Sequence, residues 1–205
     1  MSFKYYDLLS NLTVGVVVFY AVLKLYFCVE DISELVILAG GYVTGYFLNA
    51  ISGFMEPFLQ WTIGGKPSDH LLSPIREIDW TGIKKVKFYY ADEAIELLTI
   101  DAKADSSDKG KLFDYAKHRA ILCKDCRVPD FNNHYSLSRV IFATVILGVV
   151  VAEIEYYDVW YSWLISAVAL FLAWNRFRER GYYYAREVLN EYLKSKRIAI
   201  SHDKN

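Results

Sequence analysis

Two cysteines and two histidines lie close together in the middle of the chain and have side chains that can bind a metal ion. They are His118, Cys123, Cys126 and His134, with the spacing H-x4-C-x2-C-x7-H. Thiolates and imidazoles are the ligands that Zn²⁺ takes in tetrahedral sites. The spacing is not that of a standard zinc finger, and two thiols on one helix need no metal. A zinc site is therefore one hypothesis, and reduced cysteines beside two polar histidines are the alternative.

Arg127 and His134 form a second candidate site, because they match the pattern R-x6-H. This spacing resembles the active-site motif of HEPN ribonucleases, in which the pair lies on a helix and acts on RNA phosphate. The resemblance implies that Arg127 and His134 would cleave RNA. The sequence departs from that family at Val128, where a polar residue is usual, and at Pro129, which disrupts a helical motif. A ribonuclease is therefore an alternative and not the leading hypothesis.

Other signatures of catalysis are missing from the sequence. It contains no P-loop, G-x-G-x-x-G, H-E-x-x-H or G-x-S-x-G motif. The formal net charge of −1 argues against a chain that binds nucleic acid directly. We therefore expect no catalytic residue and no cofactor apart from the possible zinc, and a protein that works by binding.

Four apolar stretches dominate the chain, and the charges around them are distributed asymmetrically. The stretches are Leu8–Cys28, Leu35–Met55, Val140–Tyr157 and Val159–Asn175. The links between the paired stretches carry acidic residues but no Lys or Arg, whereas the basic residues lie in the middle segment and at the two ends, apart from Lys24. Because cytoplasmic segments are enriched in Lys and Arg, this pattern predicts an all-α membrane protein of the inner membrane, with four transmembrane helices in two hairpins and both termini cytoplasmic.

The overall composition agrees with this topology. Apolar residues make up 54% of the 205 residues and aromatic residues 17%. Two of the stretches reach the ~20 apolar residues that span a bilayer. The alternative is an unusually apolar soluble helical bundle. The first stretch is predicted to be a retained helix, since no small-residue cleavage site follows it.

The predicted topology divides the chain into four segments. They are an N-terminal transmembrane hairpin (residues 1–55), a small cytoplasmic subdomain (residues 56–138), a C-terminal transmembrane hairpin (residues 139–175) and a basic cytoplasmic helical tail (residues 176–205).

Within the cytoplasmic subdomain we expect short helices and at most one pair of strands. The residues before Tyr90 alternate like a strand, whereas Asp92–Ile100 is typical of a helix. A polar turn is expected at Ala104–Gly110, and a second helix over Lys111–Arg127 that stops before Pro129.

Small residues line one side of the second apolar stretch. Gly41, Gly45, Asn49 and Gly53 are spaced by four and therefore stack on one helix face. Small residues let two helix backbones approach closely in lipid, and an Asn can form a hydrogen bond across the contact. The spacing therefore predicts a helix-packing ridge, and a pore lined by Asn49 is the alternative. The partner helix can belong to the same chain or to a second copy.

Basic residues follow the fourth apolar stretch. Arg176, Arg178, Arg180 and Arg186 are predicted to bind anionic lipid or a partner, since cations just inside a span are attracted to such lipids. An apolar face for packing on the subdomain is also expected, formed by Tyr182, Val188, Leu189 and Tyr192.

Glu153 and Glu155 lie near the end of the third stretch, beside a cluster of aromatic residues. Aromatic side chains anchor spans at the membrane interface, so both carboxylates are expected in the outer headgroup zone. The alternative is a cation-attracting vestibule, because carboxylates inside a membrane are costly and usually functional.

The arrangement of these segments resembles that of small membrane proteins of bacterial antiphage systems, in outline the membrane component of the Kiwa system. Multi-pass accessory proteins of RNA-targeting CRISPR loci share the plan. No diagnostic motif underlies the resemblance, so it assigns no role to any residue. It implies a non-enzymatic sensor or effector in the bilayer that self-associates and engages a cytoplasmic protein partner. A pore that depolarises the membrane, and a membrane-anchored ribonuclease or zinc protein, are the alternatives.

Overall fold

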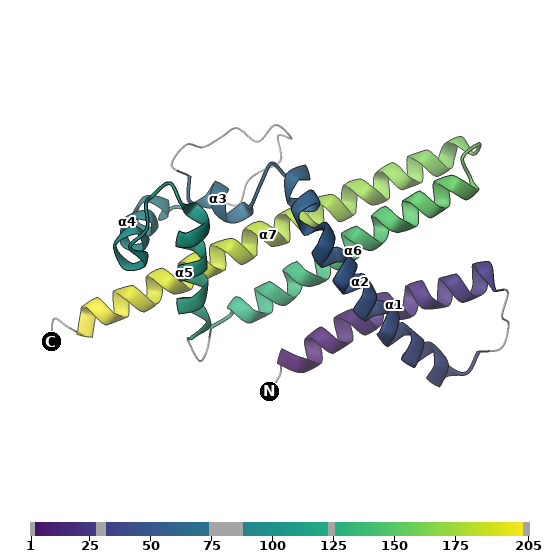
Figure 1. Ribbon diagram of the computed structural model, residues 1–205, viewed down its shortest axis with the longest axis horizontal. Helices are drawn as coiled ribbons and strands as arrows, with labels where there is room; N and C mark the ends of the chain where they lie inside the picture. Colours follow the sequence, from purple (N-terminus) through teal and green to yellow (C-terminus); the bar gives the residue numbers. More distant parts are fainter. Residues whose placement is uncertain (1–2, 28–31, 74–87, 123–125, 203–205) are drawn as a thin grey trace. The chain divides into compact units, whose positions relative to one another are not determined.

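The computed structural model describes residues 3–27, 32–73, 88–122 and 126–202, and every regular element in those ranges is a helix (Figure 1). The helices are α1 (Phe3–Tyr26), α2 (Glu34–Thr62), α3 (Pro67–Leu71), α4 (Ala91–Ala102), α5 (Lys109–Ile121), α6 (Val128–Glu155) and α7 (Trp160–His202). The all-helical class is therefore confirmed. The strand considered before Tyr90 falls mostly on residues 74–87, outside the described part of the chain.

The chain divides into two compact units. The first unit comprises residues 1–59 and 133–177, and the second comprises residues 60–132 and 178–205. These borders lie a few residues from the segment borders expected from composition. Helix α7 is continuous and supplies residues to both units.

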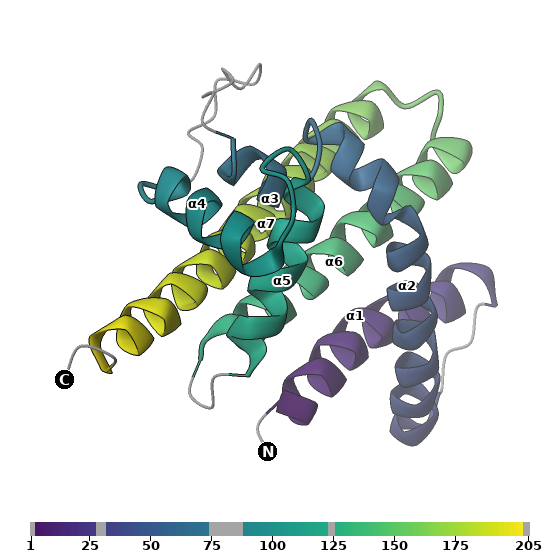
Figure 2. The same cartoon turned by 60° about the vertical axis from the view of Figure 1, so that its left-hand side comes forward.

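In the first unit, α1 and α2 cross at a point where both helices carry glycine (Figure 2). A Cβ atom added to Gly15 would fall on the backbone of Gly41 and Gly45, and one added to Gly45 would fall on the carbonyl group of Asn11. Because the neighbouring atoms belong to backbone, no rotamer change can make room. The absence of side chains is therefore what allows these helices to approach so closely.

Helix α6 and the first half of α7 run side by side in Figures 1 and 2. The ring of Phe177 lies 5.5 Å from that of Tyr135 and 5.7 Å from that of Phe142, measured between centroids. At the other end of the pair, the carboxylate of Glu153 on α6 accepts hydrogen bonds from α7. Aromatic packing at one end and polar contacts at the other thus fix these two helices against each other.

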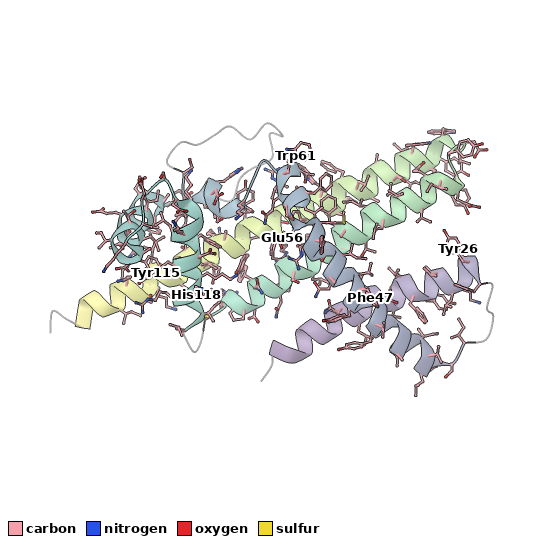
Figure 3. All side chains as sticks on the ribbon, in the orientation of Figure 1. Tyr26, Phe47, Glu56, Trp61, Tyr115 and His118 are labelled. Carbon is pink, nitrogen blue, oxygen red and sulfur yellow. The ribbon has the colours of Figure 1, made fainter. Side chains whose placement is uncertain are left out.

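The helices of the first unit expose large apolar side chains to their surroundings. Phe54 is 93% exposed and Phe47 is 61% exposed, and both lie on α2 (Phe47 is labelled in Figure 3). Two helical stretches, Glu34–Leu71 and Val128–Glu155, are long and apolar enough to cross a membrane, and only 22% of each apolar window is buried. A core helix of a soluble protein would be mostly buried, so the exposed surface favours membrane association.

The second unit is built from α3, α4 and α5 packed on the second half of α7. The predicted apolar face of the tail is confirmed, because Tyr182, Val188, Leu189 and Tyr192 are all buried. The hydroxyl of Tyr182 forms a hydrogen bond of 2.7 Å with Nδ1 of His70 on α3. The ring of Tyr192 packs edge-on against the ring of Tyr115 on α5.

Helix ends in the middle of the chain differ from the predictions for local reasons. Helix α2 runs through Pro57 to Thr62 and then stops at Gly64 and Gly65, which adopt φ values of +84° and +122°. Such conformations suit glycine and cap a helix. Helix α5 ends at Ile121, earlier than predicted, and Pro129 starts a new helix instead of following one. Proline is well tolerated in a first turn, where its missing N–H is not needed.

Acid should destabilise the second unit through Asp101. Its carboxylate accepts a hydrogen bond from Tyr192 at 2.7 Å and lies 2.5 Å from the ammonium of Lys196. Burial acts to raise the pKa of Asp101, but the bonds to Lys196 and Tyr192 outweigh it, and the pKa lies below its ordinary value. A carboxyl with a lowered folded-state pKa stabilises the fold above its unfolded pKa of ~3.9, and this contribution is lost as the pH falls through the folded value.

The Asp101→Asn variant should therefore be less stable than the parent chain at neutral pH and lose less stability on acidification. Thermal unfolding of the detergent-solubilised chain across this pH range measures both effects. Asp114→Asn, at an exposed carboxyl on α5, is the matched control. Parallel acid profiles for Asp101→Asn and the parent chain would contradict the assignment.

Candidate functional site

Opposite charges meet between α2 and α6 within the first unit (Glu56 is labelled in Figure 3). The guanidinium of Arg139 forms an ion pair with Glu56 through Nη1 and donates through Nη2 to Asn49 Oδ1 at 3.4 Å. The hydroxyl of Tyr135 donates to the other oxygen of Glu56 at 3.1 Å. The side chains of Arg139 and Glu56 are 17% and 29% exposed, so the pair is largely removed from the surface. We call Asn49, Glu56, Tyr135 and Arg139 the polar cluster.

The polar cluster lies far from the first residue of α2, Glu34, and from the last residue of α6, Glu155. At 1.5 Å per residue, Asn49 is about 22 Å along α2 from Glu34, and Arg139 is about 24 Å along α6 from Glu155.

A charged side chain that is largely removed from solvent is costly and needs a partner. Glu56 supplies the opposite charge to Arg139, while Asn49 and Tyr135 supply hydrogen bonds. One donor of the cluster, Arg139 Nε, is buried without a hydrogen-bond partner among the described residues. The cluster therefore ties α2 to α6 strongly but leaves part of its polarity unsatisfied.

A second polar contact joins α6 to α7. One oxygen of Glu153 accepts hydrogen bonds from Ser162 at 3.1 Å and from Ser166 at 2.5 Å. The other oxygen is buried and has no hydrogen-bond partner among the described residues. Glu153 is thus turned toward α7, whereas Glu155 is exposed. The two carboxylates, treated together in the sequence, occupy different environments.

The glycine-spaced ridge on α2 divides into parts with different neighbours. Gly41 and Gly45 are buried against α1 of the same chain, and Asn49 reaches α6. A Cβ atom added to Gly53 would meet nothing within 4 Å. The close contacts at Gly41 and Gly45 are therefore intramolecular.

The four arginines predicted to bind lipid or a partner differ in their exposure to solvent. Arg176 is exposed and Arg180 is partly exposed, as a surface role requires. Arg178 is only 3% exposed, and burial lowers the pKa of its guanidinium. The guanidinium of Arg186 lies 5.0 Å from the ring centroid of Tyr183. Arg178 is therefore turned away from solvent, whereas the role of the group in binding lipid or a partner stays a prediction.

The Cys/His group is described only in part, because Cys123 lies outside the described residues. His118 is exposed on α5, Cys126 precedes α6, and His134 lies on α6 within the other unit. Among the described residues, no three His, Cys, Asp or Glu side chains are grouped so that they can hold a metal. The zinc hypothesis stays a prediction.

Arg127 immediately precedes the first residue of α6, on which His134 lies, and its carbonyl accepts a hydrogen bond from the N–H of Phe131 at 3.2 Å. Its guanidinium lies 5.7 Å from the ring of Phe131. The ribonuclease hypothesis stays a prediction.

The sequence did not point to Arg139, Glu56 or Tyr135 as functional residues. One signal was available: Glu56 directly follows the apolar stretch that ends at Met55, and Arg139 directly precedes the one that begins at Val140. Both residues thus mark an end of an apolar stretch, where the chain becomes polar.

Comparisons with known proteins give this chain no relatives. No family model, no curated protein and no solved structure matches it. Any assignment of function therefore depends on the residues of this chain and on their arrangement.

Proposed function

We propose that this chain is a four-pass protein of the bacterial inner membrane that acts as a non-enzymatic sensor or effector of antiphage defence. The observation that carries the membrane part is the large, exposed apolar surface of the helices in the first unit. In this proposal, α1, α2, α6 and the first half of α7 cross the bilayer as two hairpins. Both termini and the second unit lie in the cytoplasm, as the distribution of Lys and Arg favours.

The second unit is the part proposed to engage a cytoplasmic protein partner. Helix α7 continues from the proposed membrane segment into this unit, where Tyr182, Val188 and Tyr192 are buried. Because one helix contributes residues to both units, it gives a covalent route by which an event in one unit can act on the other. The resemblance in arrangement to antiphage membrane proteins supplies the biological setting.

Self-association is proposed to use a surface other than the buried glycines of α2. Gly41 and Gly45 are covered by α1, whereas Phe47 and Phe54 on the same helix are exposed. Exposed aromatic rings can pack against a second copy in lipid, where association depends on close van der Waals contact.

An oligomeric pore is the second candidate, favoured by two buried polar atoms. Arg139 Nε and Glu153 Oε2 both lack a hydrogen-bond partner among the described residues, although each lies on a helix proposed to span the membrane. A hydrated path would satisfy both. Currents in planar bilayers that change selectivity in Glu153→Gln would favour the pore over the scaffold.

A phage challenge of cells that express the chain with its neighbouring genes tests the proposed function. We expect reduced plaque formation, and we expect one cytoplasmic protein to be recovered with the chain from solubilised membranes. Equal plaque counts with and without the chain, across a varied set of phages, would contradict the defence role.

The Phe54→Ala variant should form smaller oligomers than the parent chain without unfolding.

A further inference from the structure

A hollow of about 320 Å³ opens on the second unit, beside the start of α4 and the last turns of α7. The residues that line it are Tyr90, Asn190, Leu193, Lys194, Arg197 and Ile198. Leu193 is buried, whereas Tyr90 and Ile198 are about half exposed. Sites for small molecules start at about 300 Å³ and combine apolar side chains with a few polar groups. The hollow has both properties.

The charged groups that line the hollow are hydrogen-bond donors with unused capacity. Arg197 uses Nε and Nη2 on the carboxylate of Glu93, at 3.2 and 2.7 Å, and its guanidinium lies 4.8 Å from the ring centroid of Tyr90. Nη1 takes no part in these two bonds to Glu93. Lys194 makes one bond of 3.4 Å to Glu191, and its side chain is 64% exposed. An ammonium has three N–H donors, so two are unused.

The lining is suited to an anion. It contains two cationic groups, one amide at Asn190 and no carboxylate. Glu93 and Glu191 do not line the hollow; they are the ion-pair partners of Arg197 and Lys194. A phosphate group presents several oxygens to separate donors, and its hydrogen bonds with Arg and Lys are charge-assisted and strong.

We propose that this hollow binds a phosphate-bearing small molecule whose apolar or planar part contacts Tyr90, Leu193 and Ile198. The phosphate accepts hydrogen bonds from Lys194 and from Nη1 of Arg197. Two sources offer this chemistry, a soluble nucleotide and the headgroup of an anionic phospholipid. The site would give the second unit a chemical ligand in addition to the protein partner proposed above, and its occupancy can be measured without reference to phage defence.

Calorimetric titration of the full-length chain in detergent tests this assignment, with ADP and glycerophosphoglycerol as the probes. Binding of ADP identifies a nucleotide-type ligand, and binding of glycerophosphoglycerol alone identifies a lipid headgroup. In Lys194→Gln, the affinity for the probe that binds should fall about tenfold, since one charge-assisted hydrogen bond is lost.

Lys111→Gln is the matched control. Lys111 is also exposed and also pairs with a carboxylate three residues earlier, Asp108, but it does not line the hollow. This variant should bind as the parent chain does, and equal melting temperatures of the two variants exclude misfolding. The assignment is overturned if neither probe binds at millimolar concentration, or if both variants weaken binding equally.

Discussion

Replacing Arg139 by Met while Glu56 is retained should destabilise the first unit by about 3 kcal/mol, because it breaks a largely buried ion pair between α2 and α6 by removing one partner. The carboxylate would keep only the hydrogen bond from Tyr135 among the contacts that the polar cluster provides. Glu56→Gln should have a similar effect, since Arg139 would then be the unpaired charge. Thermal or denaturant unfolding in detergent measures both changes.

The double variant Glu56→Gln/Arg139→Met tests whether the two residues stabilise the fold as an ion pair or independently of each other. Removing both charges leaves no uncompensated ion, so the double variant should be more stable than the sum of the two single effects predicts, by about 0.5–3 kcal/mol. Glu155→Gln, at an exposed carboxylate on α6, should change stability little and is the control. Additive effects of Glu56→Gln and Arg139→Met would contradict the proposed pairing.

Gly15→Ala and Gly45→Ala should each weaken the packing of α1 on α2. The added methyl groups would fall on backbone atoms of the facing helix, so the two helices must separate to accept them. Overpacking of this kind costs about 1–3 kcal/mol, occasionally more. The melting temperature in detergent should therefore fall clearly for both variants.

Gly53→Ala provides the matched control on α2. Its added methyl group meets nothing within 4 Å, and alanine favours a helix over glycine by up to about 1 kcal/mol. The melting temperature should therefore be unchanged or slightly higher. Equal losses for Gly45→Ala and Gly53→Ala would show that the α1–α2 contact does not have the described geometry.

Local patterns in the sequence were sufficient to predict much of the helical structure. The helical period of Asp92–Ile100 and the polar residues of Ala104–Gly110 correspond to α4 and the turn after it. The apolar positions of the tail predicted the buried face of α7. These features depend on residues a few positions apart, and such spacing is what a single sequence shows directly.

Features that depend on distant residues were not predictable in the same way. The spacing of Gly41 and Gly45 indicated a close helix contact, but the contact is completed by Gly15 on another helix. Glu56 and Arg139 are far apart in the chain and meet only because α2 packs on α6. Arg178 was grouped with exposed arginines by its neighbours in sequence, although its position on the helix turns it into the protein.

The membrane topology is the central claim, and labelling of single cysteines in intact cells tests it most directly. The cysteines would be placed at Ser33, Ser107, Asp158 and Lys204 of a chain in which the native cysteines are replaced. The account predicts that an impermeant reagent applied from outside modifies the positions at Ser33 and Asp158 but not those at Ser107 and Lys204. Modification of all four positions to the same extent, or of Ser107 together with Asp158, would contradict the four-span arrangement.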